Sequence, residues 1–136
     1  MPDATRILVA GDAAGPVLAL DESLSFWGGF ESQTGCVIDQ AHPQVGQSLA
    51  GRIVTMSVGR GSSSASSVLA EAIRLGTAPA ALIMLESDEI VVLGAVVAEE
   101  LYAKVMPVLL VDAATLKAVA AAGWAKIHTD GHIELS

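Results

Sequence analysis

The chain has 136 residues, of which 52% are hydrophobic, 16% are charged and only 4% are aromatic. This is the length of a single domain, so we expect residues 1–136 to form one domain with a core of Ala, Val, Leu and Ile, and the hydrophobic content excludes global disorder. The net charge of −8, from 15 acidic and 7 basic residues, argues against binding to nucleic acid or to an anionic membrane surface.

Cysteine content and the first residues set further limits. Cys36 is the one cysteine, so it has no partner for an internal disulfide, and the chain alone cannot hold an iron–sulfur cluster or a cysteine-rich zinc site. The start lacks the long apolar stretch of a signal peptide, and the longest apolar run, Ile90 to Ala98, is too short to span a bilayer, so we expect a cytoplasmic protein. The mean hydropathy of +0.57 leaves two interpretations open, an Ala/Val-rich core or an apolar face shared with another protein.

In the first half of the chain, short apolar runs separated by glycines predict β-strands. We expect these strands at residues 6–10, 16–20, 35–39 and 51–56. A break is expected at Gly28-Gly29, and His42 precedes a proline, which favours extended or turn geometry at that histidine.

The second half alternates helices with strands. Helices are predicted at 66–75, 90–102 and from Asp112 to about 121, and strands at 80–85, 107–111, 125–128 and 132–135. The helix at 90–102 is apolar almost all round, which predicts burial on both sides. The order of elements predicts a mixed α/β domain in which helices cover a small parallel sheet.

A glycine- and serine-rich segment, residues 59–67, joins the last predicted strand of the first half to the first helix. Two glycines allow left-handed backbone angles and close approach to a ligand. The amides of residues 62–64 would be first-turn donors, which together with the helix dipole favour a carboxylate or a phosphate. Arg60 adds a positive charge with a bidentate fork. The alternative is a solvated, serine-rich helix cap.

Other candidates are weaker. Asp39 and His42 form either an acid–base pair or a turn, and His128 and His132 would need further ligands to hold a metal ion. Trp27 and Phe30, with Gly28 and Gly29 between them, either line a pocket or plug the core. From the residues alone, the chain therefore offers an anion-binding serine turn without a convincing base, metal or cofactor site.

Several short motifs follow one another between about residues 16 and 111. They are Leu24–Gly29, Thr34-Gly35, Val37–Asp39, His42-Pro43, Gly46, Gly51–Ile53, Gly59–Ser64, Glu71 and Gly76–Ala80. In this order they resemble the small subunit of aconitase X. The resemblance implies an α/β fold of the swivelling β/β/α type, like the swivelling domain of aconitase.

The same resemblance implies a dehydratase that works as a heterodimer with a large aconitase X subunit. The large subunit would carry the iron–sulfur cluster on its own cysteines, where the cluster acts as a Lewis acid on the leaving hydroxyl, and this chain would bind none by itself. Ser62 would accept the proton from the substrate carbon, with its alkoxide stabilised by the helix N-terminus, Arg60 and the nearby cluster. Gly61 and Ser63 would contribute to substrate binding, together with Arg60 and Ser64.

One position departs from the aconitase pattern. Aconitases have a carboxylate-binding arginine two residues after the serine, where this chain has Ser64. Carboxylate binding would fall to backbone amides, Arg60 or the partner, which argues against a tricarboxylate substrate. Two small-molecule substrates are associated with the family, cis-3-hydroxy-L-proline in bacteria and mevalonate 5-phosphate in archaea, and the Ala-rich, Lys-poor composition favours the first. The competing class is a non-enzymatic module that binds an anion or mediates assembly.

Overall fold

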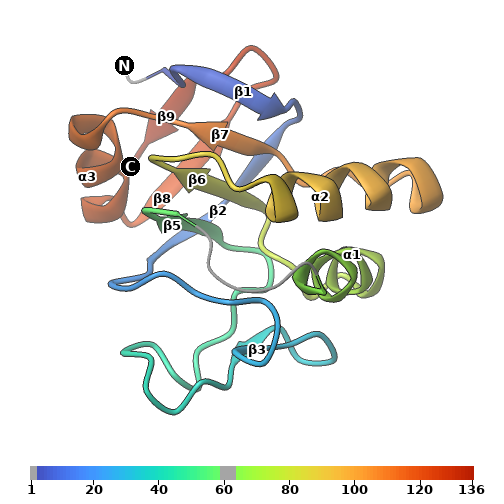
Figure 1. Cartoon of the computed structure of the whole chain (residues 1–136). Helices are drawn as coiled ribbons and strands as arrows, with labels where there is room; N and C mark the ends of the chain where they lie inside the picture. Colours follow the sequence, from blue (N-terminus) through green and yellow to red (C-terminus); the bar gives the residue numbers. More distant parts are fainter. Residues whose placement is uncertain (1–2, 59–63) are drawn as a thin grey trace.

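A seven-stranded sheet forms the centre of the computed structural model, which describes residues 3–58 and 64–136 (Figure 1). The strands lie in the order β1-β7-β6-β5-β2-β8-β9. Their bounds are β1 (Arg6–Val9), β2 (Ala13–Ala19), β5 (Ile53–Met56), β6 (Ala81–Met84), β7 (Val108–Leu110), β8 (Trp124–Ile127) and β9 (Ile133–Leu135).

Four neighbouring strands of this sheet, β2, β5, β6 and β7, run parallel. Every residue of β5 and β6 is buried, which explains why β6 is a continuous apolar run and why β5 is apolar except at Thr55. β1 and the β8–β9 hairpin add antiparallel strands at the two ends. The predicted parallel layer is therefore confirmed, with β2 beginning three residues earlier than the predicted 16–20.

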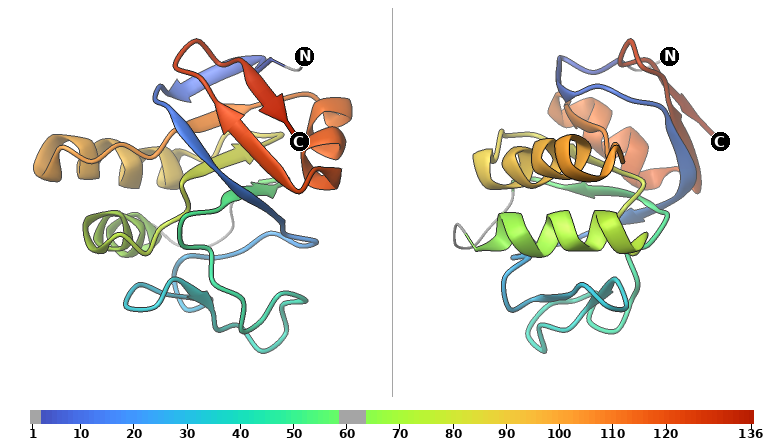
Figure 2. Two further views of the ribbon diagram at one scale, coloured as in Figure 1. Left: turned by 180° about the vertical axis from the view of Figure 1, so that it is seen from behind. Right: turned by 90° about the vertical axis from the view of Figure 1, so that its right-hand side faces the viewer.

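Helices cover both faces of the sheet (Figures 1 and 2). On one face, α1 (Ala65–Leu75) and α2 (Glu89–Tyr102) pack over a core that includes Val54, Leu82 and Val108. On the other, α3 (Ala113–Ala121) packs through Val119 against a second core with β8 and β9. In the described part of the chain, none of these helices has the length and apolar character that crossing a membrane requires.

The predicted helix ends are confirmed by their caps. The side chain of Asp88 accepts a hydrogen bond from the amide of Ile90 at 2.9 Å, and that of Asp112 accepts one from Thr115 at 2.7 Å. Gly76 ends α1 with a φ of 80°, the left-handed angle for which glycine is suited.

Residues 20–52 form a separate lobe that lies against α1 on the side away from α2 (Figure 2). Its strands, β3 (Phe30–Glu31) and β4 (Cys36–Val37), pair with each other in a two-stranded sheet. The predicted strand at 35–39 is thus shorter than expected and lies outside the main sheet. The connection from β2 to the parallel strand β5 consequently passes through this lobe instead of through a helix.

The expectation that the second helix is buried on both sides is wrong. Val91, Ala95 and Ala98 of α2 are buried against α1 and the sheet, but Leu93 and Val96 are 49% and 44% exposed. The reason is topological, because α2 is the outer member of the helix pair and no described element lies over its second face. Glu99 and Glu100, at the C-terminal end of α2, are exposed.

Replacing Gly35 by alanine should destabilise the lobe. Gly35 has a φ of +76°, and a Cβ there would lie 2.4 Å from the carbonyl oxygen of Thr77. Gly46 provides the control, since its φ is +88° but a Cβ would meet nothing within 4 Å. In urea unfolding we expect Gly46→Ala to lower the free energy of unfolding by about 1–2 kcal/mol, from backbone strain alone, and Gly35→Ala by about 3 kcal/mol or more. Equal losses would contradict the steric part of this prediction.

Candidate functional site

Most of the predicted serine site lies outside the described residues. This applies to Arg60, Gly61, Ser62 and Ser63. The elements on either side are described, since β5 ends at Met56 and α1 begins at Ala65. The segment therefore follows the carboxyl end of a central parallel strand and precedes a helix, which is the arrangement in which α/β sheets bind ligands.

Ser64, the last of the predicted site residues, occupies the N-cap position of α1. It is exposed, and its side chain makes no capping hydrogen bond. Its carbonyl oxygen accepts a hydrogen bond from the hydroxyl of Ser67 at 2.9 Å. The structure thus places Ser64 at the helix start, as predicted, without showing what its hydroxyl binds.

The electrostatics of α1 differ from those of the other two helices. Asp88 and Asp112 place a carboxylate at the N-termini of α2 and α3, whereas the first turn of α1 contains no acidic residue. An acidic cap compensates the partial positive charge of a helix N-terminus. At α1 that charge is not compensated from within the first turn, so this end of the helix suits an anionic ligand.

Gly94 of α2 sets how closely the first turn of α1 is held. A Cβ on Gly94 would lie 2.8 Å from the carbonyl oxygen of Ser66 and 3.2 Å from the Cβ of Leu69. Only glycine allows this approach without a shift of backbone. The position of the helix start therefore depends on a residue 30 positions away from Ser64, which sequence analysis did not single out.

Asp39 and His42 behave as turn residues in the contacts that the structure shows. The Asp39 carboxylate accepts from the amide of Ala41 at 2.9 Å. His42 is buried, its Nδ1 accepts from the amide of Gln44 at 3.1 Å, and its Nε2 lies 2.9 Å from the carbonyl oxygen of Glu22. Because both ring nitrogens bond to main-chain groups of the lobe, the imidazole stabilises the lobe and is not paired with Asp39 as an acid–base partner.

The two aromatic residues that flank Gly28-Gly29, Trp27 and Phe30, differ in their exposure to solvent. Phe26 is buried and packs edge-to-face on Phe30, with ring centroids 5.1 Å apart. Trp27 is 57% exposed, and its amide and carbonyl both bond to the hydroxyl of Ser25. The core-plug interpretation thus holds for Phe30, which is buried, whereas Trp27 lies at the surface.

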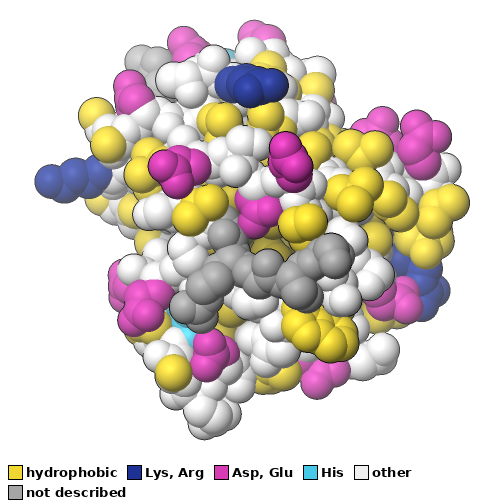
Figure 3. All heavy atoms as spheres, viewed as in Figure 1, with side chains coloured by type: hydrophobic (Ala, Val, Ile, Leu, Met, Phe, Trp, Pro, Cys, Tyr) yellow, Lys and Arg dark blue, Asp and Glu magenta, His cyan; other side chains and the backbone are white. Residues whose placement is uncertain are grey.

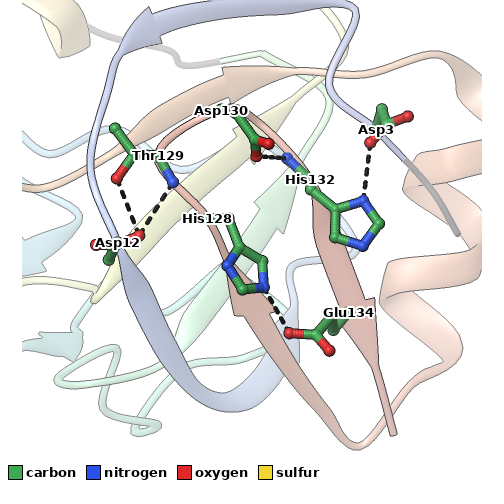
Figure 4. Close-up of polar contacts among 7 residues, drawn as sticks. All are labelled: Asp3, Asp12, His128, Thr129, Asp130, His132 and Glu134. Carbon is green, nitrogen blue, oxygen red and sulfur yellow. Dashed lines mark hydrogen bonds and ion pairs between the residues drawn. The ribbon is translucent and has the colours of Figure 1, made fainter.

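The two hairpin histidines each face a carboxylate (Figure 4). Nε2 of His128 lies 2.5 Å from an oxygen of Glu134, and Nδ1 of His132 lies 3.0 Å from an oxygen of Asp3. The rings lie side by side with centroids 5.6 Å apart. Among residues 3–58 and 64–136, no group of three or more His, Cys, Asp or Glu side chains is arranged to hold a metal ion. His132 therefore links the hairpin to the N-terminal segment, whereas His128 joins the two strands of the hairpin through Glu134.

Neighbouring groups shift the titration of Glu134. The hydrogen bond from His128 lowers the pKa of the Glu134 carboxyl below 4.5, and the charges of His128, Lys126 and His132 act in the same direction. The carboxyl is solvent-accessible, so this effect is modest.

A family comparison identifies the fold unit. The model of the aconitase X swivel domain matches residues 3–135, which is nearly the whole chain. The chain belongs to the aconitase X swivel domain family. The match extends beyond the motifs between residues 16 and 111 and includes α3 and the β8–β9 hairpin.

Named relatives of this swivel domain fall into two groups. A cis-3-hydroxy-L-proline dehydratase of Pseudomonas aeruginosa is 45% identical over 96% of this chain, and one of Hypocrea jecorina is 40% identical over 88%. The chain spans only 22% and 20% of these two proteins. A phosphomevalonate dehydratase small subunit of Methanothermobacter thermautotrophicus is 42% identical over 68% of this chain and 71% of its own length.

Solved structures agree with the family assignment. The holo-form of aconitase X from Thermococcus kodakaraensis matches 99% of this chain and 97% of that chain, with a TM-score of 0.84 and 31% identity. A UPF0107 protein solved by NMR in solution matches with the same TM-score and identity over 100% of this chain. The predicted swivelling-domain fold is thereby confirmed.

Replacing Gly94 by alanine should loosen the start of α1. Alanine in a helix interior is normally favoured over glycine by about 1 kcal/mol, but here its methyl group would press on the backbone at Ser66. We expect the free energy of unfolding to fall by about 1–3 kcal/mol, with faster amide exchange over residues 65–69. Gly123→Ala is the control, because its Cβ would meet only Ser136, at 3.9 Å. A stabilised Gly94→Ala variant would contradict the close approach.

Replacing Glu134 by glutamine should make stability less dependent on acidic pH. The pKa of Glu134 is lower in the folded chain, so the charged carboxylate stabilises the fold above about pH 4.5, and this contribution is lost as the pH falls through the folded pKa. Glu134→Gln should therefore be less stable than wild type at pH 6 and converge with it near pH 3. Urea unfolding across this range tests the prediction, with the exposed Glu100→Gln as control. A constant difference at all pH values would contradict it.

Proposed function

We propose that this chain is the small, swivel-domain subunit of a dehydratase of the aconitase X type, active in the cytoplasm as a heterodimer with a large subunit. The observation that carries the proposal is the segment Gly59–Ser64 between a central parallel strand and the uncompensated N-terminus of α1, in a chain of the aconitase X swivel domain family. Residues 1–136 would form a single domain. The dehydratase names of its relatives support the reaction class.

For the substrate we propose cis-3-hydroxy-L-proline. Relatives named for this reaction align with 96% and 88% of the chain, whereas the Methanothermobacter phosphomevalonate dehydratase small subunit aligns with 68%. The runner-up is mevalonate 5-phosphate, which is supported by the 42% identity with that small subunit. Both substrates carry an anionic group, a carboxylate or a phosphate, that suits the α1 N-terminus.

Ser62 is proposed to accept the proton from the substrate carbon. A serine hydroxyl is a weak base, so its alkoxide needs nearby positive charge. The N-terminus of α1 supplies part of that charge, because no acid in its first turn compensates the helix dipole. Arg60, two positions before Ser62 in sequence, would supply a full charge.

Substrate binding is proposed to involve Arg60, Gly61, Ser63 and Ser64. The guanidinium of Arg60 can hold a carboxylate through two parallel hydrogen bonds. Ser64 fits this role in that it is exposed and its hydroxyl does not cap the helix. Large-subunit residues would complete the site.

The iron–sulfur cluster is proposed to belong to the large subunit. The described residues of this chain do not fit such a group, since Cys36 is partly buried in β4 with its Sγ 4.0 Å from the carbonyl oxygen of Thr34. They also contain no group of three potential ligands. Bound to the partner, the cluster would act as a Lewis acid toward the leaving hydroxyl.

Ser62→Ala in the reconstituted complex should lower kcat by at least about 10³-fold, the range expected when a catalytic base is removed. Iron content and subunit association should stay unchanged, since the proposed role of the hydroxyl is proton transfer. The measurement is anaerobic dehydration of cis-3-hydroxy-L-proline and of mevalonate 5-phosphate by both subunits together and by this chain alone.

The control for this experiment is Ser63→Ala, which should be milder because its proposed contribution through the backbone amide survives. Near wild-type turnover by Ser62→Ala would refute the proton-acceptor role. Activity of the isolated chain would refute the need for a large subunit. Turnover of the phosphorylated substrate alone would reverse the choice of substrate, and the absence of any turnover by the complex would favour a non-enzymatic module.

A further inference from the structure

The outer face of α2 is apolar and has no covering element in the described part of the chain. Leu93 and Val96 are one turn apart and about half exposed, and Leu101 continues the exposed apolar side toward the helix end. Figure 3 shows hydrophobic side chains gathered over α2. A surface helix normally turns charged residues to solvent, and contiguous exposed apolar surface marks an interaction site.

This face is hollowed into a groove between α2 and β1. The groove has a volume of about 670 Å³ and is lined mostly by apolar side chains. Its lining consists of Arg6, Ile7, Leu8, Ser87, Glu89, Val92, Leu93 and Val96. Because β1 is the end strand of the seven-stranded sheet, the groove lies at the border of the domain and not between its layers.

We propose that this groove is the docking site for the large subunit of the dehydratase, an inference that rests on the proposed function. The Pseudomonas aeruginosa relative contains the whole domain as 22% of its chain. The remaining four-fifths of that polypeptide is the kind of partner that a separate small subunit must find in another chain. It is large enough to cover an apolar face of this size.

The position of the groove fits a partner that also reaches the start of α1. β5 and β6 are parallel and each is followed by a helix on the same face, so α1 and α2 begin at the same edge of the sheet. Figure 2 shows the two helices side by side. Ser87 and Glu89 line the groove at the start of α2, and they therefore lie at the same edge of the sheet as Ser64 at the start of α1. One partner surface can cover both places.

Charge disfavours the alternative occupant, a second copy of this chain. Each copy carries a net charge of −8, and a symmetric pairing through α2 would bring the acidic residues of two α2 helices toward each other. The large subunit should instead present an apolar ridge, with an acidic group opposite Arg6 and a basic group opposite Glu89.

The test measures the Kd between this chain and the large subunit from the same organism. Leu93→Asp and Val96→Asp should each raise the Kd by about tenfold or more, because each places a charge in an apolar contact. Ala118→Asp makes the same charge change on exposed α3, across the sheet, and should leave the Kd within about twofold. At saturating large subunit, kcat should be unchanged in all three variants.

Amide exchange of the wild-type complex gives a second readout that does not depend on a variant folding. Exchange should slow at residues 6–8 and 89–96 when the large subunit binds. Unchanged Kd values, or protection confined to other surfaces, would overturn the docking site while a Ser62-dependent activity still stood. A wild-type dimer that Leu93→Asp dissociates would assign the groove to a second copy and overturn the proposal. Failure of the wild-type subunits to associate would overturn the proposed function itself.

Discussion

The contact between α1 and α2 at Gly94 is the constraint on which the candidate site depends. A missing side chain on α2 lets the backbone of α1 approach within a distance that a Cβ would forbid. Ala95 and Ala98, also small and buried on α2, belong to the same core cluster as the buried residues of α1. The packing of small residues on α2 therefore helps to place the start of α1.

The lobe of residues 20–52 fixes the other end of the same helix. The hydroxyl of Thr77 donates to the carbonyl of Ser32 in the lobe, and the amide of Gly51 donates to the carbonyl of Ala78. His42 and Gln44 hold the lobe itself together through bonds to Glu22 and Asp21. Several motifs that carry the family resemblance are thus structural parts of this connection.

Much of the fold could be predicted from the sequence, because its elements are strongly marked. Asp88, Asp112 and Gly76 mark helix ends through local bonds and angles that a single sequence reveals. The exposure of α2 could not be predicted in this way, since an apolar helix looks the same whether its second face meets its own chain or another. The close approach of α2 to α1 at Gly94 could not be predicted either, because it depends on which helix packs against this residue.

For the candidate site, sequence predicted that the segment lies between a strand and a helix and that Ser64 is at the helix start, and the structure agrees with both. The roles of Ser62 and its neighbours remain proposals that rest on the family and on the charge of α1. The hairpin histidines show the opposite case. Their types suggested ligands, but His128 and His132 are engaged by Glu134 and Asp3, and only the folded chain brings Asp3 to residue 132.

The clamping of α1 at both ends has a consequence for motion. With Gly94 at its start and Thr77 just beyond its end, sliding or tilting of the helix by itself would disrupt these contacts. Opening and closing of a site at its N-terminus would then have to come from rotation of the whole domain on its partner. In such an arrangement the domain would move as one body, and the orientation in which it docks on the partner would decide how close Ser62 comes to the substrate.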